Sequence, residues 1–74
     1  MVKKLDLHGV KHADVFRTVD QFIGHHIQRG TTNVEIVTGY SKHMKSIVET
    51  VLIDYNVSSK ESWMNAGKLD VDLT

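Results

Sequence analysis

Short apolar runs with strand periodicity alternate along this chain with two longer stretches of helical periodicity. Residues 4–8 alternate between polar and apolar side chains, and residues 34–38 are rich in β-branched side chains, as is typical of strands. From about residue 13 to 29, and again over residues 44–55, apolar side chains recur every three to four positions, which predicts two amphipathic helices. The apolar positions expected to face the core are Val15, Phe16, Val19, Phe22, Ile23 and Ile27 in the first helix, and Met44, Ile47, Val48, Val51, Leu52 and Tyr55 in the second.

The remaining elements complete a simple order. Gly30 and Asn56 follow the two helical stretches, where a residue in the left-handed conformation commonly ends a helix. Residues 57–64 have weak strand character, residues 65–67 (Asn-Ala-Gly) are typical of a turn, and residues 69–73 alternate as a last strand. The predicted fold class is therefore α/β in the order β-α-β-α-β-β, as a single domain over residues 1–74.

This order has a geometric consequence for any site. A strand, helix, strand unit with short connections forms a parallel pair through a right-handed crossover. The first two strands therefore end at the same edge of the sheet, which is where open α/β sheets bind ligands. Charged residues alternate in the first and last strands, so both helices are expected to cover the other face only. The prediction is a two-layer α/β sandwich with one sheet face open to solvent or a partner.

Composition narrows the class of function. Nine basic and nine acidic residues give no net charge, which argues against a broad electrostatic grip on nucleic acid. There is no cysteine, so neither disulfides nor thiolate metal sites stabilise the small core. No apolar run has the length of a membrane span and no signal-peptide pattern opens the chain, so a cytoplasmic protein without membrane association is expected.

Two clusters of reactive side chains follow the first two predicted strands. Asp6 and His8 end the first strand and Gly9 comes next, while residues 38–43 (Thr-Gly-Tyr-Ser-Lys-His) follow the second. Because the two strand ends share an edge, we expect Asp6, His8 and His43 to converge there. Imidazole serves as a general base or acid because its pKa is near 6.5, and a carboxylate on the same face can orient it or raise its pKa.

These clusters resemble the motifs of the Smr domain, the small MutS-related domain found at the C-terminus of some MutS-like proteins and as stand-alone proteins. Residues 5–9 match its LDLHG motif, residues 39–43 line up with its glycine-rich TGxGxH segment, and residues 65–73 resemble its closing NxG turn and strand. The resemblance covers nearly the whole chain. Ser41 stands where the family usually has its second glycine, and Met44 where serine often follows the histidine, so both departures bear on substrate contact and activity.

The resemblance implies a fold like the C-terminal domain of translation initiation factor 3. It also implies endonuclease activity, as nicking of DNA or cutting of RNA, and several family members act on RNA in translation quality control. The family's motif aspartate and histidines correspond to Asp6, His8 and His43, which are therefore the expected catalytic residues. No cofactor is expected.

The second cluster also suits phosphate binding. Backbone amides over residues 39–42 lie at the start of the second helix, where amides and the helix dipole favour phosphate, and glycine permits close approach. Two lysines can add charge-assisted phosphate contacts, and a tyrosine ring can stack on a base. The residues expected to contact nucleic acid are Gly9, Gly39, Tyr40, Ser41, Lys42 and Lys45.

Other interpretations of the same residues remain open. Asp6 and His8 are also typical of a plain surface edge strand, and three ligands without fixed spacing are a weak metal signal, so no metal is expected. His25 and His26 are adjacent on a helix, face different directions and are expected at the surface or rim. Two functions follow: an endonuclease that acts on RNA or nicks DNA, with RNA the favoured substrate, or a non-catalytic module that binds RNA, the ribosome or a protein partner. In either case the domain is expected to be a monomer.

Overall fold

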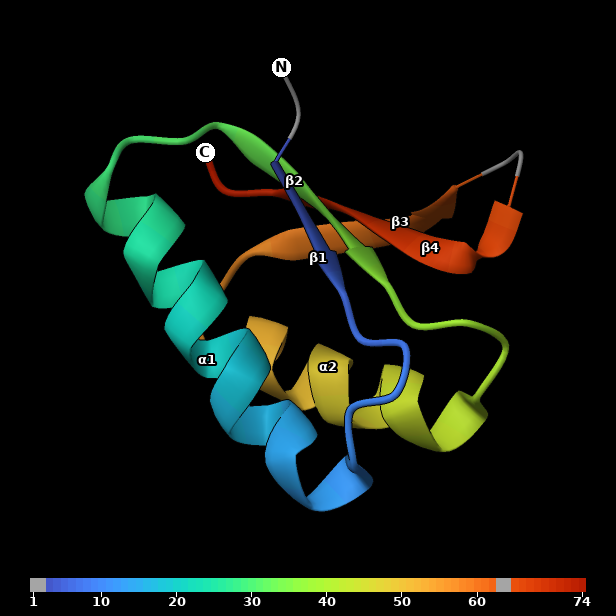
Figure 1. The fold of residues 1–74 in the computed structure, drawn as a ribbon. Helices are drawn as coiled ribbons and strands as arrows, with labels where there is room; N and C mark the ends of the chain where they lie inside the picture. The colour runs from blue at the N-terminus through green and yellow to red at the C-terminus, as the bar shows by residue number, and fades with distance from the viewer. Residues whose placement is uncertain (1–2, 63–64) are drawn as a thin grey trace.

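The computed structural model describes residues 3–62 and 65–74 and has the predicted element order (Figure 1). The strands lie in the order β1-β2-β4-β3, with β1 and β2 parallel and the other neighbouring pairs antiparallel. The elements are β1 (Lys3–Asp6), α1 (His12–Gln28), β2 (Asn33–Val37), α2 (Lys42–Asp54), β3 (Ser58–Ser62) and β4 (Asn65–Asp72).

Both helices pack on the same face of the sheet, which leaves the other face uncovered (Figure 1). The alternation in β2 illustrates the cause, because Val34 and Ile36 are buried against the helices while Glu35, between them, points to the uncovered face. The prediction of a two-layer sandwich is confirmed. The core between the layers consists of Leu7, Val15, Val19, Ile23, Val34, Ile36, Met44, Val48, Val51, Leu52, Leu69 and Val71.

Both helices end as their sequences predict. Gly30 has φ +77° and Asn56 has φ +56°, so each adopts the left-handed conformation directly after the helix cap. In α2 the amide of Val57 then donates to the carbonyl of Leu52 at 3.1 Å, and α1 closes with the same hydrogen-bond pattern. These bonds satisfy carbonyl groups that a helix end otherwise leaves unpaired.

Two strand boundaries differ from the prediction. β1 ends at Asp6 and not at residue 8, because the backbone turns after the buried Leu7. Residues 65–67 belong to β4, so the predicted turn there was wrong; Asn65 pairs with Ser62 of β3. Pairing with the neighbouring strand β3 thus overrides the local turn preference of an Asn-Ala-Gly sequence. The end of the expected third strand, residues 63–64, lies outside the described residues.

The buried stripe of α1 also differs from the prediction. Phe16 and Ile27 remain 45% and 40% exposed, because neither α2 nor the sheet covers the flank of the helix on which they lie. His26 is instead buried, at 7% exposure, and continues the stripe three residues after Ile23. Its Nδ1 atom lies 3.0 Å from the Thr31 hydroxyl. The expectation of a surface position for His26 was therefore wrong.

Burial changes the acid–base behaviour of His26. Removal of the ring from water lowers the pKa of His26, and the nearby positive charge of His25 acts in the same direction. The ring of Phe22 packs edge-on against it, with centroids 4.6 Å apart. The imidazole is thus part of the packing at the end of α1 and not a surface group.

Candidate nucleic-acid site

The segment between β1 and α1 holds the first histidine on a fixed turn. The Oδ1 atom of Asp6 accepts a hydrogen bond from the backbone amide of His8 at 2.9 Å. The amide of Val10 donates to the carbonyl of Leu7 at 3.0 Å, and Gly9 has φ +80°, a conformation that favours glycine. The side chains of Asp6 and His8 are exposed, whereas Leu7 between them is fully buried. The carboxylate therefore orders the backbone that carries the imidazole.

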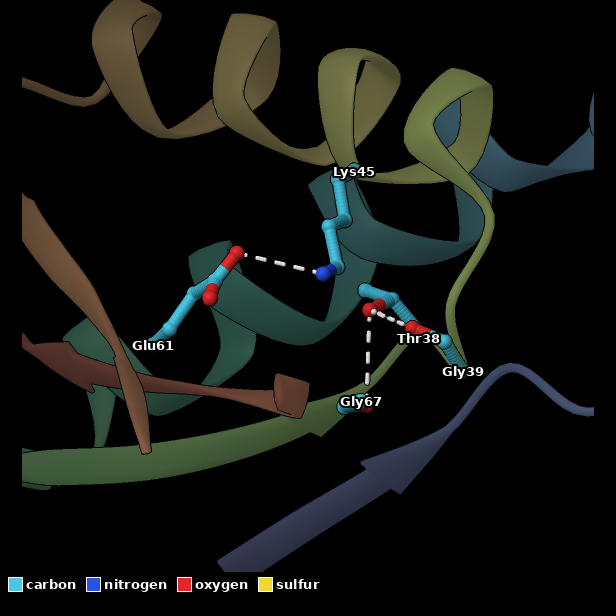
Figure 2. Close-up of polar contacts among 5 residues, drawn as sticks. All are labelled: Thr38, Gly39, Lys45, Glu61 and Gly67. Atoms are coloured by element: carbon cyan, nitrogen blue, oxygen red, sulfur yellow. Dashed lines mark hydrogen bonds and ion pairs between the residues drawn. The ribbon is translucent and has the colours of Figure 1, made fainter. Parts of the chain in front are cut away.

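The segment between β2 and α2 is tied to the start of β4. The amides of Thr38 and Gly39 both donate to the carbonyl of Gly67, at 2.8 and 3.0 Å. The buried hydroxyl of Thr38 lies 3.0 Å from the carbonyl of Gly39 and 3.4 Å from that of Gly67, and Figure 2 shows all three residues meeting at one point. The amide of Gly39, which was expected to face a phosphate, is thus already bonded within the protein.

Sequence reasoning missed the structural importance of Thr38 and Gly67. These residues are 29 positions apart, and no local pattern links them. The sequence held a small hint, because a threonine hydroxyl can bond a neighbouring backbone group. Together they fix where the loop leaves the sheet, and hence where α2 begins.

The start of α2 presents an exposed basic surface. Ser41 is the N-cap, and its hydroxyl accepts from the amide of Met44 at 3.1 Å. Lys42 and His43 follow with exposed side chains, and Tyr40 is 78% exposed. Within the described part of the chain, the amides of Lys42 and His43 have no hydrogen-bond acceptor. The positive charge of Lys42 opposes the helix dipole here, and this first turn contains no acidic residue that would offset it.

Lys45 lies one turn further along α2 and points away from this basic surface. Its ammonium group is 3.1 Å from Oε1 of Glu61 on β3, and its side chain is only 15% exposed. Figure 2 shows the side chain reaching from α2 toward β3, close to the Thr38 loop. The charge that was expected to contact phosphate is therefore paired with the carboxylate of Glu61, whose side chain is exposed.

A ring contact joins the starts of the two helices. The imidazoles of His12, the first residue of α1, and His43 of α2 have centroids 4.6 Å apart and planes inclined at 48°. The first turns of α1 and α2, which follow the segments that carry His8 and Tyr40, therefore lie against each other at this edge. Over residues 3–62 and 65–74, no three His, Asp or Glu side chains form a group that could hold a metal ion.

The parallel register accounts for the common edge. Asp6 pairs with Val37, and the amide of Leu7 still donates to the carbonyl of Val37 at 3.0 Å. The residues that follow each strand, including His8 and the loop to His43, consequently leave the sheet at the same end. This is the edge at which α/β sheets bind ligands.

Comparison with known proteins identifies the family. The family model of the Smr domain matches residues 5–68, so the chain belongs to the Smr family. This family is generally nuclease-like and binds nucleic acids. No curated protein and no solved structure matched the chain, so the likeness to the C-terminal domain of translation initiation factor 3 stays a prediction. In the described residues, neither helix combines the length and the hydropathy that a membrane span requires.

Proposed function

We propose that this Smr domain is an endonuclease that cuts RNA in preference to DNA. The observation that carries the proposal is the contact between the starts of α1 and α2 through the rings of His12 and His43, directly after the loops that leave the sheet edge where β1 and β2 end. A second observation supports it. Lys42 places a positive charge at a helix start without an acidic residue beside it, and such violations of local preference are typical of functional sites.

The chemistry divides between two imidazoles. Cleavage of RNA requires a base that takes the proton from the 2′-hydroxyl, whose oxygen then attacks the adjacent phosphorus. The bond to the 5′-oxygen breaks, and an acid gives that oxygen a proton. Imidazole performs either step near neutral pH, so we assign these two roles to His8 and His43 as a pair.

Asp6 has a positioning role in this proposal. Its carboxylate bonds the backbone amide of His8, and that bond orders the turn that presents the imidazole. We therefore expect Asp6→Asn, which keeps an oxygen acceptor, to retain most activity, and Asp6→Ala to lose it. Equal loss in both variants would show that the negative charge of Asp6 matters, and not the turn.

Substrate contact comes from the start of α2. Lys42 and the free amides beside it suit a backbone phosphate, and the exposed ring of Tyr40 suits a stacked base. Lys45 contributes less direct charge because Glu61 balances it. Preference for RNA follows from the proposed use of the 2′-hydroxyl as the nucleophile, which DNA lacks.

The decisive experiment is incubation of the pure protein with end-labelled RNA and DNA, with and without EDTA. His8→Ala should lower the cleavage rate by about 10²–10⁴-fold with RNA affinity unchanged. The backbone bond to Asp6 does not depend on the His8 side chain, so the turn should persist. His25→Ala, which removes an exposed histidine from the far end of α1, is the matched control and should cleave like the parent protein.

Metal dependence and binding supply two further readouts. We expect EDTA to leave cleavage unchanged, because the proposed site offers two imidazoles and one carboxylate, whereas Mg²⁺ prefers several oxygen ligands. Lys42→Ala should instead weaken RNA binding modestly for every sequence. The slope of log K for binding against log salt concentration should become shallower by about one, as expected for the loss of one phosphate contact. Loss of cleavage in EDTA with recovery in Mg²⁺ or Mn²⁺ would overturn the proposed chemistry.

One observation favours the second candidate, a non-catalytic module that binds RNA, the ribosome or a protein. The uncovered sheet face carries a cross-strand row of mixed charge, in which Lys4, Glu35, Asp70 and Lys60 are successive neighbours. A shallow hollow of about 540 Å³ lies at the other end of this sheet from the motif segments. This candidate gains support if the protein leaves all RNA and DNA intact, and if His8→Ala and Lys42→Ala only reduce binding.

A further inference from the structure

We propose that His12 is a positioning residue that fixes the orientation of the His43 ring. This inference rests on the proposed function, because the orientation of the His43 ring matters only if that imidazole takes part in RNA cleavage. His12 lies outside the residues that the motifs singled out. Its ring is the one aromatic or imidazole neighbour of His43 among the described residues, with centroids 4.6 Å apart.

His43 needs such a neighbour because its own surroundings leave the ring free. It lies on the exposed side of the first turn of α2, while Met44 after it is buried. The second side-chain torsion of histidine has broad preferences, so an exposed imidazole rotates unless another group packs against it. A ring tilted by 48° at this distance restricts that rotation from one side.

His12 is itself held in place by the segment before it. Val10 packs against the core and donates to the carbonyl of Leu7, and Leu7 is fully buried. The amide of Asp14 donates to the carbonyl of Lys11 at 2.8 Å, which closes the first turn of α1 around His12. The ring that contacts His43 therefore projects from a fixed backbone and is not on a loose loop.

Stability does not explain a histidine at this position. The side chain of His12 is exposed, so its burial adds little, and histidine is an ordinary helix former. A histidine at this position does contact the ring of His43, and that contact connects the start of α1 directly to the proposed acid–base group.

The expected effect on catalysis is moderate. Aromatic contacts of this kind change a conformational equilibrium by about 2- to 10-fold. His12→Ala should therefore lower kcat by about 2- to 10-fold and leave KM unchanged, because His43 would spend less time in the productive orientation. His12→Phe keeps a ring without nitrogen atoms and should retain most of kcat.

The test combines cleavage kinetics with side-chain relaxation of the His43 ring carbons by NMR. The proposal expects His43 to become more mobile in His12→Ala, to remain ordered in His12→Phe, and to be unaffected in the control His25→Ala. Unchanged ring order in His12→Ala overturns it. An equal loss of kcat in His12→Ala and His12→Phe also overturns it, since the nitrogen atoms of His12 would then be required.

The NMR measurement separates this inference from the proposed function. If the parent protein cleaves nothing, the endonuclease proposal fails, yet the relaxation data still decide whether His12 orders the His43 ring. Because both side chains are exposed, we expect every variant to fold, and thermal melts of each variant check this.

Discussion

Ser41 offers a quantitative test of how the candidate site is built. Its hydroxyl accepts from the amide of Met44 at 3.1 Å, and its backbone is extended, with φ −73° and ψ 114°, as an N-cap requires. Replacing an N-cap serine by alanine costs about 1 kcal/mol, whereas glycine costs only a few tenths. For a domain of this size, about 1 kcal/mol corresponds to a fall in Tm of about 4–8 °C.

Thermal and urea unfolding measure this difference in stability directly when they are applied to Ser41→Ala, Ser41→Gly and the parent protein. We expect Ser41→Ala to be the least stable of the three, with Ser41→Gly close to the parent. The urea m-value should not change, because the folded state keeps its compactness. A Ser41→Ala protein as stable as the parent would refute the assignment of the hydroxyl as the cap of α2.

Variants of Ser41 also distinguish effects on the stability of the fold from effects on substrate contact. The Ser41 hydroxyl is directed to its own helix, so restoring the family's glycine should leave RNA cleavage within about twofold of the parent rate. Ser41→Asp should cap α2 at least as well, since a carboxylate suits the helix dipole, but should weaken RNA binding by repelling phosphate. A tenfold gain in cleavage in Ser41→Gly would show that the serine side chain obstructs the substrate.

Three further predictions concern stability elsewhere in the molecule. Thr38→Val should cost about 1 kcal/mol in urea unfolding, because it removes a buried hydroxyl that bonds two carbonyls; an unchanged midpoint would contradict this. Burial lowers the pKa of His26 below its ordinary 6.5, so the unfolded chain binds a proton at this residue more readily than the folded protein does. The free energy of unfolding should therefore be highest above about pH 6.5 and should fall as the pH drops below this value. Melts from about pH 8 to pH 5 should show this slope, and His26→Gln should flatten it. An alanine at Gly24 would place its Cβ 3.0 Å from the Tyr55 hydroxyl, so Gly24→Ala should gain about 1 kcal/mol of helix stability in a Tyr55→Phe background and less in the parent; equal gains would show that the contact is harmless.

The local features of the fold could be predicted well from the sequence. Periodicity identified both helices, because the spacing of Val15, Val19 and Ile23 reflects which side of a helix is buried. Gly30 and Asn56 marked the helix ends, because a positive φ is a property of a single residue. His26 was misjudged although it continues the same spacing, since a titratable side chain was expected to remain in water.

The candidate site was only partly predictable, for a physical reason. The crossover rule placed the residues after β1 and β2 at one edge, because strand direction follows from chain order. The bonds from Thr38 and Gly39 to Gly67, the ion pair of Lys45 with Glu61 and the contact of His12 with His43 join residues far apart in sequence. Such contacts depend on the packed distances between elements, which no local pattern encodes. The sequence alone thus determined the elements and their order, and the tertiary structure decided which polar groups at the shared edge are committed within the protein and which remain free for a substrate.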